Sequence, residues 1–411
     1  DMMTVEQALE KMLAAIRPIT DEQTVDIIDS LGRISAEDCI AESPVPSFAR
    51  SAMDGYAVRA ADIQDRVAKH APADTDGKTR VVLRVAGKLL AGDYRELDYE
   101  PGTAVRVMTG AYIPDGYDAV VKQEDTDMGE VSVEIRCTVK PYENYCKTGE
   151  NMAAGHIAVA GGTLIRPIHM GLLAAAGKSR INVVRQPRIT VIVTGSELLR
   201  PGQAIQPGKI YDSIGYMISG AASQQGIKVS GPHICGDDAE TAERLLQKAL
   251  SEADFIITTG AISVGEKDFI PALMQKMGAD LLFRGADIQP GTPTMASRIN
   301  DKVILSLSGN PYAALANFEV YFWEAMARMT GCRDMLPQQA EALLADRYDK
   351  VNSHRRLIRA MGKDGRVFLP AKVHSSSVIG NMDGCNCFID LEAGRSVKPG
   401  DTVKIRYIKG M

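Results

Sequence analysis

The chain has 411 residues, of which 45% are apolar and 24% charged, and its formal net charge is −5 at pH 7. This length exceeds what one hydrophobic core usually serves, so we expect two to four domains. The acidic balance offers no basic surface to nucleic acid, and the longest apolar runs, such as residues 171–177, are too short to span a bilayer. We therefore expect a cytoplasmic protein that binds neither nucleic acid nor membrane. Its seven cysteines are odd in number and lack a Cys-x-x-Cys pair, which favours reduced thiols over disulfides or a zinc site.

The first segment is expected to be helical and extended. Thr4 and Gln7 have the spacing of a capping box, and apolar residues follow at helical spacing until Pro18. A second helical piece is expected around residues 25–31. We interpret residues 1–44, together with residues 148–186, as a helical and extended linker domain.

Residues 45–147 are predicted to form an inserted β-lobe. Short alternating runs rich in Val are separated by turn signals such as Pro101-Gly102. Asp54-Gly55 is ordinarily a turn. The polar end of the run that reaches Thr109 is only a weak indication of a cleft.

The segment 187–331 alternates between two patterns. Strand-like runs are expected at 188–193, 227–231, 253–258, 280–284, 294–298 and 303–307, and helices near 211–225, 239–252, 268–276 and 312–329. This alternation predicts a three-layer α/β domain with a mostly parallel sheet. In such a sheet, ligands bind at the carboxyl ends of the strands.

Three of the predicted strands end in loops of small and polar residues at that edge. These loops are Thr194-Gly195-Ser196-Glu197, Thr258-Thr259-Gly260-Ala261 and Ser308-Gly309-Asn310-Pro311. Gly260 and Gly309 lie where backbone must approach a ligand closely, and the helices that follow present unpaired amides to an anion.

Acidic residues at loop positions in this domain suggest a metal ion. Glu197, Asp237, Asp238 and Asp268 would suit Mg²⁺, which takes a few carboxylates together with phosphate and water oxygens. Each acid also has a structural explanation. Asp237-Asp238 has the position of a helix N-cap pair, and Asp268 has that of a helix start.

Residues 332–411 are expected to form a small C-terminal β domain. The cluster of basic residues from His354 to Arg359 and the tract Ser375-Ser376-Ser377 are candidates to bind an oxyanion, although a solvated face is the commoner explanation of either.

A series of short motifs runs in order along nearly the whole chain: Ser51-Ala52-Met53-Asp54-Gly55-Tyr56-Ala57, Met108-Thr109-Gly110-Ala111, Gly149-Glu150, Thr194-Gly195-Ser196-Glu197-Leu198, Ile210-Tyr211-Asp212-Ser213, Gly236-Asp237-Asp238, Ser263-Val264-Gly265-Glu266-Lys267-Asp268, Pro290-Gly291 and Ser308-Gly309-Asn310-Pro311. Together they closely resemble the molybdopterin molybdenumtransferases, the MoeA family to which the gephyrin catalytic domain also belongs. The resemblance implies an elongated four-domain subunit, a homodimer with a cleft built from both subunits, and molybdopterin binding by residues 187–331.

The resemblance also implies a reaction and its residues. The substrates would be adenylylated molybdopterin (molybdopterin-AMP) and molybdate, and Mg²⁺ would assist cleavage of the adenylate as the metal is inserted at the dithiolene. Asp54, Thr109, Glu197 and Asp268 would be catalytic, and Glu197, Asp237, Asp238 and Asp268 would hold the ion. The pterin, phosphate and oxyanion would contact Thr194, Gly195, Asp212, Ser213, Thr259, Gly260, Ser263, Pro290, Gly291, Ser308, Gly309, Asn310, Pro311, Arg355 and Ser376.

The chain departs from the family pattern at several positions. Asn151, Ala261 and Thr292 stand where an aspartate, a glycine and a lysine are usual; Gly285 replaces a basic residue, and His354 an arginine. Each lost charge-assisted contact is worth about 1.5–3 kcal/mol.

Three hypotheses follow: an active transferase with altered tuning, for example for tungstate; a paralogue that binds molybdopterin or a partner without inserting metal; and a nucleotide pyrophosphatase of the competence-damage type. The last lacks the β-lobe and the C-terminal β domain. We favour the enzyme because Asp54, Glu197, Asp237 or Asp238, and Asp268 remain.

Overall fold

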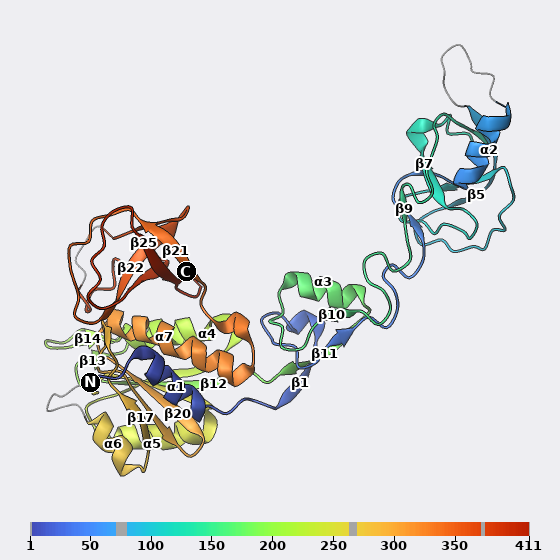
Figure 1. Cartoon of the computed structure of the whole chain (residues 1–411). Helices are drawn as coiled ribbons and strands as arrows, with labels where there is room; N and C mark the ends of the chain where they lie inside the picture. The colour runs from blue at the N-terminus through green and yellow to red at the C-terminus, as the bar shows by residue number, and fades with distance from the viewer. Residues whose placement is uncertain (1, 71–79, 263–268, 371–374, 411) are drawn as a thin grey trace.

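The structure, a computed structural model, describes residues 2–70, 80–262, 269–370 and 375–410. Four bodies follow one another in an elongated arrangement (Figure 1), with the β-lobe at one end and the α/β and C-terminal domains at the other. None of the helices in the described ranges combines the length and apolar character needed to cross a membrane.

The α/β domain is built on a six-stranded sheet. Its strands run in the order β15 (Lys228–Cys235), β12 (Arg188–Thr194), β16 (Phe255–Thr259), β20 (Lys302–Leu307), β19 (Met295–Ile299) and β17 (Asp280–Arg284). β15, β12, β16 and β20 pair in parallel, whereas β19 is antiparallel to both of its neighbours. The expected mostly parallel sheet is therefore confirmed.

Helices cover both faces of this sheet (Figure 1). Alternate residues of the strands face opposite layers: Ile257 and Leu305 pack in one core, and Ile256 and Ile304 in the other. Burial on both faces explains why the strands read as continuous apolar runs. The helices of the first layer are α1 (Val5–Ala15), α4 (Ile214–Ser223) and α7 (Pro311–Thr330), and those of the second are α5 (Ala239–Glu252) and α6 (Ile270–Lys276).

Two expectations for the N-terminal segment were wrong. The capping box of α1 is present, with Thr4 and Gln7 bonded reciprocally, but α1 packs on α7 and β17 and so belongs to the α/β domain, not to the linker domain. The helix expected at 25–31 is replaced by the end of strand β1 (Glu22–Asp26) and a short 3-10 turn, Ile27–Asp29. Pairing of β1 with β11 (Arg180–Val184) overrides the local helical pattern.

The linker domain is small and has two short antiparallel ladders. β1 pairs with β11, and β2 (Cys39–Ile40) pairs with β10 (Ile157–Val159). Helix α3 (Pro167–Ala175) packs against β10.

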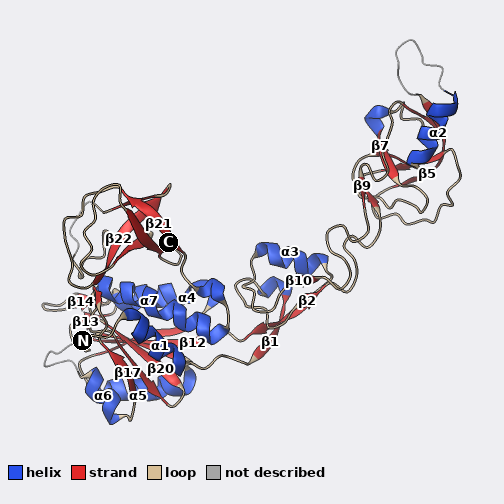
Figure 2. Cartoon of the chain, in the orientation of Figure 1, coloured by secondary structure: helices blue, strands red, loops and turns tan. Residues whose placement is uncertain are grey.

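The β-lobe has a five-stranded sheet. Its order is β7 (Ala119–Lys122), β4 (Gly55–Val58), β6 (Thr103–Val107), β5 (Val81–Leu89) and β8 (Ser132–Ile135), and β3 (Arg50–Ser51) pairs with β9 (Tyr145–Cys146). An unexpected helix, α2 (Ala60–His70), packs against it (Figure 2). Gly55, the first residue of β4, lies close to the neighbouring strand β7. A Cβ at this position would lie 2.0 Å from the carbonyl oxygen of Val121, so only glycine fits.

The C-terminal domain is a closed barrel. Strands β22 (Arg355–Lys363), β23 (Arg366–Phe368), β21 (Gln339–Leu344), β25 (Thr402–Tyr407) and β24 (Cys387–Leu391) pair in this order, and β24 returns to β22. β18 (Ile288–Gln289), from the α/β domain, extends this sheet by pairing in parallel with the start of β22. This pairing places the barrel beside the carboxyl ends of the central strands.

Candidate functional site

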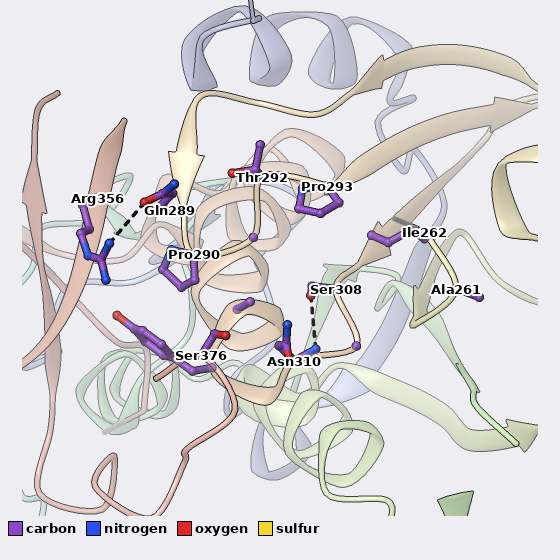
Figure 3. A pocket seen from close by; sticks show the side chains of 14 residues that line it. Ala261, Ile262, Gln289, Pro290, Thr292, Pro293, Ser308, Asn310, Arg356 and Ser376 are labelled. Carbon is purple, nitrogen blue, oxygen red and sulfur yellow. Dashed lines mark hydrogen bonds between the residues drawn. The ribbon is translucent and has the colours of Figure 1, made fainter. Parts of the chain in front are cut away.

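A large cavity lies where the carboxyl ends of β16 and β20 meet the barrel (Figure 3). It encloses about 660 Å³ and has walls from the α/β and C-terminal domains. Its lining consists of Ala261, Ile262, Gln289, Pro290, Gly291, Thr292, Pro293, Ser308, Gly309, Asn310, Tyr312, Ala313, Arg356 and Ser376. The expected residues Pro290, Gly291, Ser308, Gly309, Asn310 and Ser376 are thus brought together.

The wall at residues 290–293 is held by a buried amide. The Asn317 side chain donates hydrogen bonds to the carbonyl oxygens of Pro290, at 2.8 Å, and Ala313, at 2.9 Å. Gly291 has a φ of 95°, and a Cβ there would lie 1.8 Å from Nδ2 of Asn317. Only glycine therefore fits this turn, which packs against α7.

The opposite wall is the start of α7. The Asn310 amide donates to the Ser308 hydroxyl at 3.2 Å, and Pro311 is the first residue of the helix. The Tyr312 amide donates to the carbonyl oxygen of Ser376, so the start of α7 attracts an anion through the dipole of this long helix.

A second, smaller cavity adjoins the first and is acidic. It encloses about 270 Å³ and shares Ala261 and Gly309 with the large cavity. Strands β13 (Leu198–Leu199) and β14 (Ile210–Tyr211) form part of its rim. The expected residues that line it are Thr194, Gly195, Glu197, Asp212, Ser213, Asp237, Thr259, Gly260 and Pro311.

Two residues that line this smaller cavity, Asp212 and Thr259, each carry a buried oxygen without a hydrogen-bond partner in the described structure. Asp212 accepts a bond from the Gly215 amide at 2.8 Å through Oδ1, but its Oδ2 has no partner. The Thr259 hydroxyl is also unpaired. Burial raises the pKa of Asp212, against the opposing effect of amide hydrogen bonds. Because buried polar groups normally have partners, these atoms are suited to hydrogen-bond a ligand.

The two adjacent acids before α5 have different roles. Asp238 is the N-cap of α5 and accepts hydrogen bonds from the Glu240 and Thr241 amides, both at 3.2 Å. Its carboxylate oxygens are thus used to cap the helix, which supports the structural explanation of this residue. Asp237 lines the acidic cavity, and its amide donates to the Ser196 hydroxyl at 2.9 Å.

The expected set of metal ligands is not assembled in the described part of the chain. There, no group of three or more His, Cys, Asp or Glu side chains is placed to hold an ion. Asp268 and Ser263, two expected site residues, lie outside the described residues. Glu197 and Asp237 supply the carboxylate oxygens that Mg²⁺ prefers, but two carboxylates alone leave most of its coordination to substrate and water.

Asp54 and Thr109 form a pair in the β-lobe. The Thr109 amide, at 2.7 Å, and hydroxyl, at 2.8 Å, both donate to Oδ1 of Asp54. These two bonds lower the pKa of the Asp54 carboxyl because they favour its ionised form. Within one chain, the lobe lies at the far end from the α/β domain (Figure 1), so this pair is not brought to Glu197.

The arginine that reaches the large cavity is Arg356, not Arg355. Arg355 donates to both oxygens of Asp390, at 2.7 and 2.6 Å, and also pairs with Glu6. Arg356 donates to Oε1 of Gln289 at 3.2 Å and lines the cavity (Figure 3). Successive side chains of a strand point to opposite faces, so one of the two had to face away. The sequence contained no signal that decided which.

The departures Ala261 and Thr292 both lie in the cavity walls. Ala261 has a φ of 51°, in the left-handed region that glycine adopts without strain. The Thr292 hydroxyl is used internally, since it donates to the carbonyl oxygen of Ile288 at 2.8 Å. Gly285 also has a positive φ, 79°. Asn151 and His354 lie elsewhere, and His354 pairs with Asp287 at 2.5 Å.

Comparison with known proteins places these features in a family. Residues 3–177 match the family described as MoeA N-terminal region (domain I and II), and residues 190–328 match the probable molybdopterin binding domain. The molybdopterin molybdenumtransferase of Staphylococcus epidermidis is 35% identical over 93% of this chain and 90% of its own length. The Staphylococcus aureus protein of that name is 33% identical over 95% and 94%.

The fold agrees with these matches. A crystal structure of a molybdopterin biosynthesis MoeA protein from Pyrococcus horikoshii superposes with a TM-score of 0.83 and 27% identity, and the match covers all of both chains. With the cavities at the carboxyl ends of the central strands, the chain therefore belongs to the molybdopterin molybdenumtransferase family and is a transferase of molybdenum cofactor biosynthesis.

Proposed function

We propose that the protein inserts molybdate, or tungstate, into adenylylated molybdopterin and releases AMP. The observation that carries this proposal is the junction of two unlike cavities at Ala261 and Gly309, one acidic and one with Arg356, Ser376 and the start of α7. A substrate that spans them would present hydrogen-bond donors at one end and anionic oxygens at the other.

The acidic cavity suits the heterocycle. Oδ2 of Asp212 and the hydroxyl of Thr259 are buried and unpaired in the described structure, and both are hydrogen-bond acceptors. A pterin has ring and amino N–H groups that would satisfy such acceptors. A charge-assisted hydrogen bond from the pterin would offset the cost of burying the Asp212 carboxylate.

The large cavity suits phosphate and metal oxyanion. The Arg356 guanidinium and the Ser376 hydroxyl are donors that line it, and the positive end of the α7 dipole lies in the same wall. Cleavage of a phosphoanhydride depends on positioned charge more than on a protein nucleophile. Such donors would orient the leaving phosphate and the incoming oxyanion.

We propose that Glu197 and Asp237, with Asp268, hold Mg²⁺ at the acidic cavity. The carboxylates that line this cavity are hard oxygen donors, which fit the ion. When bound, Mg²⁺ would supply positive charge that neutralises the phosphate oxygens.

We also propose that the protein acts as a cytoplasmic homodimer. Asp54 and Thr109 form an ordered pair on an exposed loop far from the cavities of their own chain (Figure 1). In a dimer, the β-lobe of one protomer would complete the cavity of the other. The cytoplasm would keep the seven cysteines reduced.

A second candidate function is binding without metal insertion. It is favoured by Ala261, which lines both cavities where the family usually has glycine, and by Thr292, whose hydroxyl is already bonded to Ile288. The two candidates differ in turnover, not in affinity for the pterin.

The deciding experiment incubates the purified protein with adenylylated molybdopterin and Mg²⁺, with molybdate, tungstate or neither. Release of AMP that requires an oxyanion would support the transferase and give its preference. An S376A variant should bind the pterin normally but release AMP slowly. Tight binding of the pterin without AMP release would instead support the second candidate.

A further inference from the structure

Arg359, in the middle of β22, is completely buried. Its guanidinium donates hydrogen bonds to the backbone oxygens of Ser375, at 2.6 Å, and Val378, and to the side-chain oxygen of Asn381. All three acceptors belong to residues 375–381, which we call the serine segment. One planar group thus holds three points of this segment.

Tyr312 connects this arginine to the large cavity. Its ring lies 3.7 Å from the Arg359 guanidinium carbon, measured to the ring centroid. The Tyr312 amide donates to the carbonyl oxygen of Ser376 at 3.0 Å, and its hydroxyl donates to that of Leu357 at 2.6 Å. Tyr312 and Ser376 both line the cavity. Arg359 therefore lies behind the wall that presents Ser376.

The charge of Arg359 has no carboxylate partner among the described residues. Its bonded partners are neutral oxygens and an aromatic ring, whereas Arg355, on the same strand, is paired with Asp390 and Glu6. Burial lowers the pKa of Arg359, which reflects the cost of holding this charge away from water. A buried charge without a counter-charge attracts an anion in a neighbouring cavity, because little water screens it.

We propose that Arg359 is a positioning residue for the metal oxyanion: it holds the serine segment so that Ser376 faces the cavity, and its unpaired charge favours the bound anion. The inference rests on the proposed function, in which this cavity takes molybdate or tungstate. It differs from the role of Arg356 because Arg359 acts through the serine segment and does not line the cavity.

The contribution of charge is tested with Asn381→Asp. This change has the same shape and places a carboxylate against Arg359, so the segment stays held while the charge is cancelled. Calorimetric titration of the full chain with sodium molybdate should show a dissociation constant raised about tenfold. The thermal unfolding midpoint should be unchanged, whereas general damage to the fold would lower it together with the molybdate affinity.

The contribution of positioning is tested with Arg359→Gln and Arg359→Lys. Amide hydrogen exchange in residues 375–381 should accelerate in both, because neither side chain reproduces the planar fork. Molybdate affinity should fall in Arg359→Gln and be partly restored in Arg359→Lys. Arg366→Gln, at an exposed position on β23, is the matched control and should change neither quantity.

The outcomes separate the inference from the proposed function. Molybdate binding by the wild type, with unchanged affinity in Asn381→Asp or unchanged exchange in Arg359→Gln, would overturn the inference alone. Absence of molybdate binding by the wild type would overturn the proposed role of the cavity and the inference with it. If Arg359→Gln fails to fold, Asn381→Asp still decides, because it retains the arginine.

Discussion

Asp254 receives two hydrogen bonds from the guanidinium of Arg185, at 2.7 and 3.2 Å. The Arg188 amide and guanidinium also donate to this carboxylate, and Arg185 reaches Asp21 at 3.1 Å. The chain passes between the linker and α/β domains through both the segment of Asp21 and that of Arg185. One buried carboxylate therefore organises both connections.

We predict that Asp254→Asn lowers the free energy of unfolding of the α/β domain by about 2 kcal/mol, because it weakens the charge-assisted hydrogen bonds from Arg185 and Arg188 to a buried carboxylate. Burial opposes ionisation of Asp254, but the hydrogen bonds and charges of Arg185 and Arg188 outweigh it and lower its pKa. This stabilisation is present above the ordinary Asp pKa of about 3.9 and is lost as the pH falls below it. Calorimetry as a function of pH measures both effects. Asp280→Asn, which removes an exposed pair with Arg298, should cost less than about 1 kcal/mol.

Ala261→Gly should stabilise the protein, although glycine usually destabilises. Ala261 has a φ of 51°, which costs an alanine about 1 kcal/mol relative to glycine. Ala174→Gly, at an exposed position in α3, should have the opposite sign and cost about 0.5–1 kcal/mol. Thermal unfolding of the two variants compares them directly, and a shared sign would contradict the argument from φ.

Asp212→Asn should increase stability while it weakens pterin binding. Burial raises the pKa of Asp212, so its ionised form is disfavoured in the folded protein, and the penalty grows as the pH rises from about 3.9 to the raised folded pKa. We expect a gain of about 1 kcal/mol at pH 7. Denaturant unfolding and pterin titration measure the two effects. Asp383→Asn, on the exposed surface, should affect neither.

Substitutions of Asp237 and Asp238 should affect different properties, Mg²⁺ binding in the first case and thermal stability in the second. Asp238→Ala removes the N-cap of α5 and should lower the thermal midpoint while Mg²⁺ affinity is retained. Asp237→Ala should weaken Mg²⁺ binding in the presence of the pterin and leave the midpoint nearly unchanged. The reverse pattern would exchange the two assignments.

Glu319 should make stability depend on pH near neutrality. It is completely buried in α7, and burial raises the pKa of its carboxyl to about 7, despite hydrogen bonds from Trp323 and the Lys409 amide. Its contribution is fully present below the unfolded pKa of about 4.3 and is lost as the pH rises to about 7, a change on the order of 3 kcal/mol. Unfolding midpoints of the wild type and Glu319→Gln should diverge over this range. Parallel curves would refute the assignment.

The central sheet and its helices could be predicted because apolar residues recur at different spacings in the strand and helix segments of the sequence. The helix at 239–252 agrees residue for residue with α5, which has Asp238 as its cap, and the strand at 280–284 agrees with β17. Helix α2 was missed, although Ile63 and Val67 have helical spacing, because the surrounding Val-rich runs suggested only strands. The helix expected at 25–31 failed because pairing with β11 is a long-range contact that no local pattern reveals.

The candidate site was predictable where loops follow parallel strands. Thr194, Glu197 and Gly309 were expected at one edge, and they do line adjoining cavities. Arg356 was named only as part of the basic cluster 354–359, and Gln289 was missed, because both reach the cavity through the pairing of β18 with β22, between residues 67 apart. Asp54 was identified from its motif, but sequence alone does not reveal where its lobe lies.

The parallel pairing of β18 with β22, Ile288 with Arg355 and Gln289 with Arg356, also limits how the chain can be divided. A fragment that ended near Gly331 would expose the backbone groups of β18 and the apolar side of α7, where Tyr312 now packs on Phe388. Unpaired strands and exposed apolar faces promote aggregation. For protein production, the α/β domain and the barrel are therefore best expressed as one piece.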